Sequence, residues 1–166
     1  MSSKWHIKNI FKEIIIGGII LFILSNIISY IRKPELDSIS LPKIEAVLLD
    51  GSSYRVKKGR PLVIHFWATW CPTCKLEAAN IQSVSEKYEV LTVAVSSGEN
   101  TKVEAYMKER GLTFKVLNDS DGKWAAKFKV KAFPTTFIYD SKGKLRFTEI
   151  GYTTTVGFLA RLKMID

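Results

Sequence analysis

Short apolar runs alternate with stretches of helical periodicity in the central part of the chain. Residues 61–67 (PLVIHFW) and 90–95 have the length and composition of buried strands. Between them, from about residue 72 to residue 88, apolar side chains recur at helical spacing. The predicted apolar face of that helix carries Leu76, Ala79, Ile81, Val84 and Tyr88. The pattern therefore predicts a strand, a helix and a second strand in succession.

Further elements are predicted on both sides of this centre. Downstream they are a helix over 101–110, a strand over 114–117, a short helix or turn over 122–128, strands over 135–139 and 144–150, and a helix over 155–163. Gly111 is a favourable C-terminal stop for the first of these helices. Upstream, residues 44–49 and 54–56 flank Asp50-Gly51, a pair that favours a tight two-residue turn, and so predict an N-terminal β-hairpin.

The order of these elements predicts the fold class. Strands that alternate with helices imply a parallel sheet, and the hairpin of residues 135–150 adds antiparallel strands to it. We therefore expect an α/β domain with a mixed sheet flanked by helices.

Residues 14–31 (IIIGGIILFILSNIISYI) contain no charged side chain. A helix of this length rises about 27 Å, close to the thickness of the hydrocarbon core of a bilayer. A buried core helix and a cleaved signal peptide are the alternatives. So small a protein could hardly cover such a helix, and the end of the run, Asn26-Ile27-Ile28-Ser29, lacks the small residues of a cleavage site. The segment is predicted to be an uncleaved transmembrane helix that contacts the lipid bilayer.

Basic residues flank this segment and predict its orientation. Lys4, Lys8 and Lys12 precede it, whereas Arg32 and Lys33 follow it, and the excess on the N-terminal side places that side in the cytoplasm. We expect a cytoplasmic N-terminus over 1–13, the anchor over 14–31, a linker over 32–43 and a domain over 44–166. The protein would cross a bacterial inner membrane once, with its C-terminal domain in the periplasm, where disulfide exchange takes place.

Composition and charge exclude several functions. The chain has 166 residues and a net charge of +9, and beyond residue 33 its charges alternate in sign without a basic block, so nucleic-acid binding has little support. The two cysteines and two histidines, His6 and His65, cannot supply a structural zinc site alone. A structural disulfide between cysteines three residues apart would restrict the unfolded chain little. Redox chemistry remains, and no metal or organic cofactor is expected.

Cys71-Pro72-Thr73-Cys74 lies between a predicted strand and a predicted helix. The unpaired N–H groups at a helix N-terminus stabilise a thiolate, which is the form that attacks a disulfide. We therefore expect the Cys71 sulfur to be exposed and to attack, and Cys74, one turn later, to resolve the mixed disulfide. Pro72 loses nothing in the first turn, where its missing N–H would be unpaired.

The sequence FWATWCPTC (66–74) resembles the active site of the thioredoxin superfamily, and residues 130–135 resemble its cis-proline segment. The resemblance covers roughly residues 40–166. Within the superfamily the chain is similar to the membrane-anchored branch that includes cytochrome c maturation reductants. It is closer to the small anchored thioredoxin-like member of the suppressor-of-copper-sensitivity proteins, through HFWATWCPTCKLE (65–77), VAVSSG (93–98), NDSDG (118–122) and FTEIGYTTTVGF (147–158).

The resemblance implies roles for further residues. Pro134 would be a cis proline that leaves the preceding backbone free to pair with a partner peptide, and Phe133 is bulky for its position. Glu77 matches a glutamate that tunes the cysteines, although a solvated helix charge is the alternative. His65 stands where thioredoxins hold a buried acid, so it could accept a proton from Cys74, or it could be a hydrogen-bonded core residue. Trp70, like Trp67, would be a wall of the site.

The predicted function is that of a periplasmic thiol-disulfide oxidoreductase. The anchored-branch resemblance favours a reductase that is re-reduced by a membrane electron donor and acts as a monomer on disulfide-containing periplasmic proteins. Three alternatives remain open at this point. They are a dithiol oxidase, a reductant specific for cytochrome c maturation, and a non-catalytic binder of unfolded chains or copper(I).

Overall fold

The computed structural model describes residues 11–21, 23–24, 27, 38–57 and 59–165. The chain divides into two compact units, Met1–Arg32 and Lys33–Asp166, and each is considered by itself. The second unit contains the cysteines.

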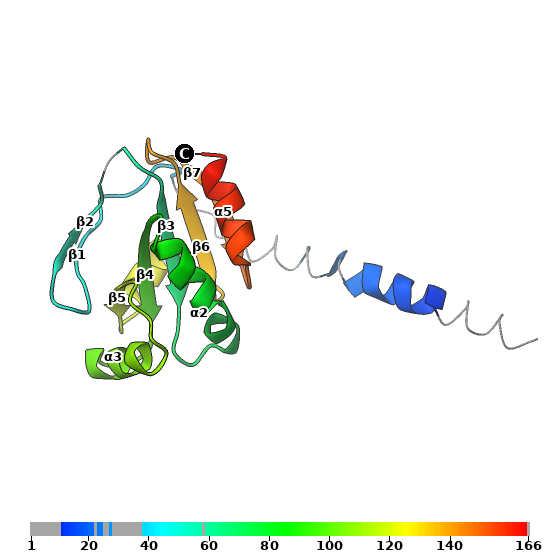
Figure 1. Ribbon diagram of the computed structural model, residues 1–166, viewed down its shortest axis with the longest axis horizontal. Helices are drawn as coiled ribbons and strands as arrows, with labels where there is room; N and C mark the ends of the chain where they lie inside the picture. The colour runs from blue at the N-terminus through cyan, green and yellow to red at the C-terminus, as the bar shows by residue number, and fades with distance from the viewer. Residues whose placement is uncertain (1–10, 22, 25–26, 28–37, 58, 166) are drawn as a thin grey trace, which may run out of the picture. The chain divides into compact units, whose positions relative to one another are not determined.

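A five-stranded mixed sheet forms the centre of the second unit (Figure 1). Its strands, in chain order, are β3 (Leu62–Trp67), β4 (Glu89–Val95), β5 (Lys115–Asp119), β6 (Thr135–Tyr139) and β7 (Leu145–Ile150). The spatial order is β5-β4-β3-β6-β7, with β3, β4 and β5 parallel and β6 and β7 antiparallel to their neighbours. The predicted mixed sheet is therefore confirmed, and β3, which leads into the cysteine motif, is its central strand.

The strands β3, β4 and β6 are buried on both sides because other elements cover both faces of the sheet. Alternate residues of the strands pack in two cores. One core joins Val63, Trp67 and Ala94 to α2 (Pro72–Ser85), α3 (Asn100–Glu109) and α5 (Thr155–Lys163). The other joins Ile64, Phe66 and Phe137 to α4 (Lys123–Lys127) and to the N-terminal hairpin.

The N-terminal hairpin consists of β1 (Glu45–Val47) and β2 (Ser53–Arg55), paired antiparallel as predicted. Its connection is longer than the two-residue turn expected at Asp50-Gly51. The pairing of the two strands ends where Leu48 N–H donates to Ser52 O at 2.8 Å, which leaves residues 49–51 as the loop. The carboxylate of Asp50 accepts from Ser52 N–H at 2.9 Å and stabilises this wider loop. Residues 39–41, within the predicted linker, pair with residues 143–145 at the start of β7.

Helix α2 begins where the pattern predicts and ends at Ser85, but its buried face differs from the prediction. The inward residues are Cys74, Glu77, Ala78, Ile81 and Val84. Leu76 is 73% exposed, and Ala79 is exposed as well. The carboxyl group of Glu77 thus occupies a core position that the apolar pattern had assigned to Leu76. Residues three and four apart share one face of a helix, so the buried face that contains Cys74 also contains Glu77 and Ile81.

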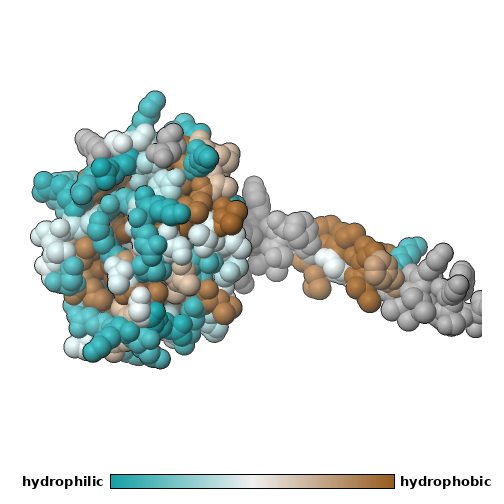
Figure 2. Space-filling view, viewed as in Figure 1, coloured by the Kyte–Doolittle hydropathy of each residue, from teal (hydrophilic) through white to brown (hydrophobic). Residues whose placement is uncertain are grey.

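The described residues of the first unit, 11–21, 23–24 and 27, are helical. Their large apolar side chains are exposed, among them Ile14, Ile19, Leu21 and Leu24, and Figure 2 shows the apolar surface of this helix. Within the described residues no helix combines the length and apolarity that a bilayer crossing requires. Residues 22, 25–26 and 28–31 of the predicted anchor, and 1–10 of the predicted cytoplasmic segment, lie outside the described residues.

The packing of α2 can be tested with two substitutions on one helix. Ile81 is fully buried, so Ile81→Ala should lower the free energy of unfolding by about 2–5 kcal/mol through lost burial and a residual cavity. Leu76→Ala removes an exposed side chain and should change it by less than about 0.5 kcal/mol. Urea denaturation of the oxidised protein measures both, and equal losses would contradict the observed face of α2.

Candidate active site

The cysteine motif occupies the junction between the end of β3 and the start of α2. Cys71 is the N-cap of α2, with extended backbone angles, and its sulfur accepts a hydrogen bond from Cys74 N–H at 3.2 Å. Pro72 occupies the first helical turn, where no intrahelical partner for an N–H exists. The partial positive charge of the helix N-terminus therefore acts on the Cys71 sulfur and favours its thiolate form once the disulfide is reduced.

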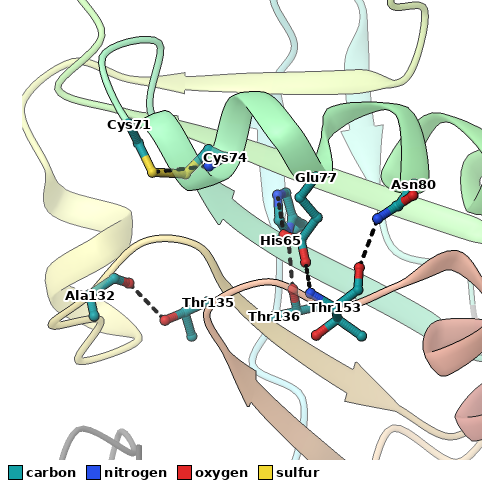
Figure 3. Close-up of polar contacts among 9 residues, drawn as sticks. All are labelled: His65, Cys71, Cys74, Glu77, Asn80, Ala132, Thr135, Thr136 and Thr153. Atoms are coloured by element: carbon teal, nitrogen blue, oxygen red, sulfur yellow. Dashed lines mark hydrogen bonds and ion pairs between the residues drawn. A yellow bond between two sulfur atoms is a disulfide. The ribbon is translucent and has the colours of Figure 1, made fainter. Parts of the chain in front are cut away.

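Cys71 and Cys74 form a disulfide, with their Cα atoms 5.3 Å apart (Figure 3). Cys71 is only 4% exposed and Cys74 only 2%, so the sequence-based expectation of an exposed Cys71 sulfur is wrong for this oxidised state. The reason is packing, since both cysteines belong to the core cluster that contains Trp67 and Ala68. The exposed surface of the motif is formed instead by Pro72, which is exposed, and Thr73, which is half-buried.

Two aromatic side chains form a rim beside the disulfide. Trp70 is 56% exposed, and its ring meets that of Phe133 edge-on, with centroids 5.7 Å apart. Trp67 instead is buried and packs on Tyr106 and Phe114, so it supports the core rather than the rim. Of the two tryptophans predicted to be walls of the site, Trp70 is therefore exposed at the rim and Trp67 is buried in the core.

The loop after β4 holds this rim in place through contacts that the sequence analysis did not anticipate. Trp70 Nε1–H donates to Ser96 O at 3.1 Å. The buried hydroxyl of Ser97 accepts from Thr69 N–H at 3.0 Å and donates to Val95 O at 3.1 Å. The only sequence signal was the segment VAVSSG at 93–98, which entered the analysis as a family likeness without a role for either serine.

The Phe133–Pro134 peptide bond is cis, as the family resemblance implies. Pro134 is buried next to the first residue of β6, Thr135, whose hydroxyl donates to Ala132 O at 2.8 Å (Figure 3). The carbonyl of Pro134 accepts from Gly151 N–H at 2.9 Å. This segment is therefore tied to the loop that follows β7.

His65 and Glu77 meet beneath the cysteines, and both are buried (Figure 3). Glu77 Oε2 lies 3.8 Å from His65 Nε2 and has no hydrogen-bond partner among the described residues. Glu77 Oε1 accepts from Thr153 N–H at 2.5 Å, and His65 Nδ1 lies 2.9 Å from Thr136 Oγ1. The two residues that sequence analysis treated as alternative proton carriers are thus one pair.

Burial favours the neutral form of each partner. It raises the pKa of Glu77 from 4.5 to about 7, while the Thr153 N–H opposes the rise and the charge of Glu149 adds to it. Burial likewise lowers the pKa of His65 from 6.5 to about 3. Glu77 Oε2 and His65 Nε2 are as close as the atoms of an ion pair, but these pKa values imply a neutral carboxyl and a neutral imidazole between about pH 3 and pH 7.

The described residues offer little for a metal ion or an organic cofactor at this place. They contain no group of three or more His, Cys, Asp or Glu side chains suited to a metal ion. A cavity of about 640 Å³ lies beside residues 40–45 and 140–143, next to the β6–β7 turn, at the end of β6 opposite Pro134. What the arrangement provides is a reducible sulfur–sulfur bond with a buried acid and imidazole behind it.

Comparison with known proteins agrees with this geometry. Residues 37–148 match the profile of the AhpC/TSA family. The chain is 28% identical over 159 residues to a thioredoxin-like protein of Haemophilus influenzae, an alignment that covers 91% of this chain and 94% of that relative. It is 32% identical over 125 residues to sporulation thiol-disulfide oxidoreductase A of Bacillus subtilis, which covers 68% and 76% of the two chains.

Solved structures show the same fold. The crystal structure of StoA from Bacillus subtilis aligns with a TM-score of 0.65 and 27% sequence identity, covering 74% of this chain and 98% of that one. Because the family profile spans most of the sequence, and relatives such as the sporulation protein are named thiol-disulfide oxidoreductases, the chain belongs to the thioredoxin-like AhpC/TSA family and is a thiol-disulfide oxidoreductase.

Proposed function

We propose that this oxidoreductase is a membrane-anchored reductase of the bacterial periplasm that passes two electrons to disulfides of partner proteins. The observation that carries the proposal is the position of the Cys71 sulfur at the N-terminus of α2, in a bond with Cys74 and beside the exposed Trp70 ring. A thiolate is stabilised at that position, and a resolving sulfur is already within bonding distance.

In the proposed reaction the Cys71 thiolate attacks one sulfur of the partner disulfide. A mixed disulfide forms, and the other partner sulfur leaves as a thiolate and takes up a proton. The Cys74 thiolate then attacks the Cys71 sulfur, which releases the second partner sulfur and forms the Cys71–Cys74 bond. The partner gains two electrons and two protons, and the oxidised domain is re-reduced by the dithiol of a membrane electron donor, with no further cofactor.

Cys74 must lose its proton before it attacks, and the buried pair is the acceptor in this proposal. Glu77 follows Cys74 by three residues on the same buried face of α2. Its raised pKa of about 7 lies closer to that of a thiol than an ordinary carboxyl does, which suits it to exchange a proton near neutral pH. His65 faces the unpaired Oε2 and stabilises the ionised carboxyl when its Nε2 carries hydrogen.

The direction of electron flow follows from the family resemblance. Thioredoxin-like proteins span a wide range of reduction potentials, from about −270 mV for thioredoxin to about −120 mV for the strong oxidant DsbA. The anchored branch favours the reducing end. A dithiol oxidase is the competing assignment, and a measured potential separates the two.

The membrane anchor is supported by the first unit. An exposed helix covered with isoleucine and leucine side chains would lie in water at a high free-energy cost, whereas in a bilayer the same side chains are solvated. The uncharged run over 14–31 is long enough to span the hydrocarbon core. The greater number of lysines before it supports a periplasmic position of the domain.

The attacking and resolving roles predict opposite behaviour of two variants. Cys74→Ala should accumulate mixed disulfides with periplasmic proteins, at least about tenfold above the wild-type level, because the second step is blocked. Cys71→Ser should form none, since it lacks the attacking sulfur. Non-reducing electrophoresis of the full chain in bacterial membranes, followed by identification of the attached proteins, measures both.

The reduction potential of the wild-type pair provides the second readout for this assignment. We expect a value below about −200 mV, in the range of reducing thioredoxin-like proteins. A value near about −120 mV would assign the protein to the oxidases instead. Mixed disulfides with Cys71→Ser, or none with Cys74→Ala, would contradict the assigned roles of the two sulfurs.

The buried carboxyl predicts a characteristic dependence of stability on pH. Because the pKa of Glu77 rises from 4.5 to about 7 on folding, its contribution to stability is complete below pH 4.5 and is lost as the pH rises through 7. Glu77→Gln removes this loss. Relative to wild type, the variant should therefore gain up to about 3 kcal/mol of unfolding free energy between pH 4.5 and pH 8.

Urea denaturation across this pH range measures the difference. Glu104→Gln, which removes an exposed carboxyl on α3, serves as the matched control and should give no such trend. The lowered pKa of His65 acts with the opposite sign, since its contribution is complete above pH 6.5 and is lost as the pH falls through 3. A constant difference between Glu77→Gln and wild type would show that Glu77 has an ordinary pKa.

The anchor can be tested by charges placed within the predicted span. The wild-type chain should remain in the membrane pellet after carbonate extraction. The double variant Ile19→Lys, Leu24→Lys should move to the soluble fraction, because each lysine near the centre of a span costs about 2.5–3.5 kcal/mol. Ile39→Lys, an exposed position outside the span, is the control and should stay in the pellet. Release of the wild-type chain from the membrane pellet into the soluble fraction would contradict the predicted anchor.

A further inference from the structure

Residues 151–155, which connect the end of β7 to the first residue of α5, are held from two sides. Gly151 N–H donates to Pro134 O at 2.9 Å, and Gly151 has a φ of 83°, a conformation that favours glycine. Two residues later Thr153 N–H donates to Glu77 Oε1 at 2.5 Å. This segment therefore contacts both the cis-proline segment and the buried carboxyl.

Asn80 fixes the same segment with both ends of its side-chain amide. Its Nδ2 donates to Thr153 O at 2.9 Å (Figure 3). Its Oδ1 accepts from the hydroxyl of Thr155 at 3.0 Å. Asn80 follows Glu77 by three residues on α2, so the two side chains lie on the same side of the helix. One helix thus holds the N–H and the carbonyl of Thr153 through neighbouring side chains.

We propose that Asn80 is a positioning residue that holds the Thr153 amide against the Glu77 carboxyl and thereby sets the proton affinity of Glu77. The inference rests on the proposed role of Glu77 as the proton carrier of the reaction. Neither Asn80 nor the 151–155 segment was a candidate in the sequence analysis.

The physical reason is that an N–H donor interacts more strongly with the ionised form of a carboxyl group than with the protonated form. A donated hydrogen bond stabilises the ionised form, so it counteracts burial, which favours the protonated form. Thr153 N–H is the one hydrogen-bond donor to Glu77 among the described residues. If Asn80 no longer restrains Thr153, the amide and carboxyl spend less time in contact, and the proton affinity of Glu77 rises.

Other charged or titratable groups lie near Glu77, and a substitution of Asn80 should leave their positions unchanged. His65 of β3 faces Oε2, and Cys74 lies one turn before Glu77 on α2. Glu149 of β7 acts on Glu77 through its charge and is paired with Arg161 of α5 at 2.6 Å. None of these four contacts Asn80 through a hydrogen bond of the described residues, so a substitution of Asn80 should act through Thr153.

Helix α2 supplies a matched control in Gln82. Its Nε2 donates to Thr113 Oγ1 at 2.9 Å, and its Oε1 accepts from Thr113 N–H at 2.8 Å. Gln82 therefore restrains a loop with both ends of its amide, as Asn80 does, but among the described residues that loop makes no hydrogen bond to Glu77. Asn80→Ala and Gln82→Ala each remove two hydrogen bonds from the same helix, and only the first should change the titration of Glu77.

The experiment is a titration of the Glu77 carboxyl carbon by NMR in the oxidised full chain, labelled with carbon-13 glutamate and assigned with Glu77→Gln. Asn80→Ala should raise the midpoint by about 0.5–1 pH unit relative to wild type. Thr155→Val, which removes one of the two contacts of Asn80 and is the milder change, should raise it by less. Gln82→Ala should leave it unchanged.

The outcomes separate this inference from the proposed function. An unchanged midpoint in Asn80→Ala, or an equal shift in Gln82→Ala, would overturn the role of Asn80. If Asn80→Ala does not fold, Thr155→Val decides by the same criterion. The pH profile of alkylation of the reduced cysteines is measured in parallel. A shifted carboxyl midpoint with an unchanged cysteine profile would support Asn80 and refute Glu77 as the proton carrier.

Discussion

Helix α2 packs one face against the central sheet, and this packing decides the arrangement of the whole site. The face contains Cys74, Glu77, Ile81 and Val84 in succession, so burial of the two aliphatic residues also buries a cysteine sulfur and a carboxyl. At its N-terminus the same helix continues directly from the motif that follows β3, which places the Cys71 sulfur at the positive end of the helix dipole. Stability and redox chemistry therefore depend on one interface.

The carboxyl on this face lies against an imidazole of the central sheet, with Glu77 Oε2 3.8 Å from His65 Nε2. A buried glutamate opposite a lysine or arginine would be ionised, and its charge would be permanent. Glu77 has a neutral histidine opposite it instead, so burial raises its pKa to about 7 without an opposing positive charge from that side chain. Its second oxygen has no hydrogen bond among the described residues. Such a group can change its charge when a neighbouring sulfur changes its own.

Three loops converge on the motif and restrain it from different directions. The loop after β4 holds Thr69 and Trp70, the cis-proline segment carries Phe133 against Trp70, and the segment after β7 bonds to Pro134 and Glu77. All three meet at the same end of the sheet, because β3 and β4 are parallel and β6 is antiparallel to β3. This topology brings the three loops together around the cysteine pair.

The sequence by itself determined the order of the elements, the mixed sheet and the redox pair. Apolar runs and a C-x-x-C motif at a strand–helix junction are defined by the spacing of residues close together in the sequence, so they can be recognised without a structure. The fold decided which face of α2 is buried, the contact of His65 with Glu77, and the hydrogen bonds of Ser97 and Asn80. These depend on contacts between residues 12 to 76 positions apart, through pairings such as Glu77 with Thr153. Such contacts arise only when strands and helices pack, and no local pattern encodes them.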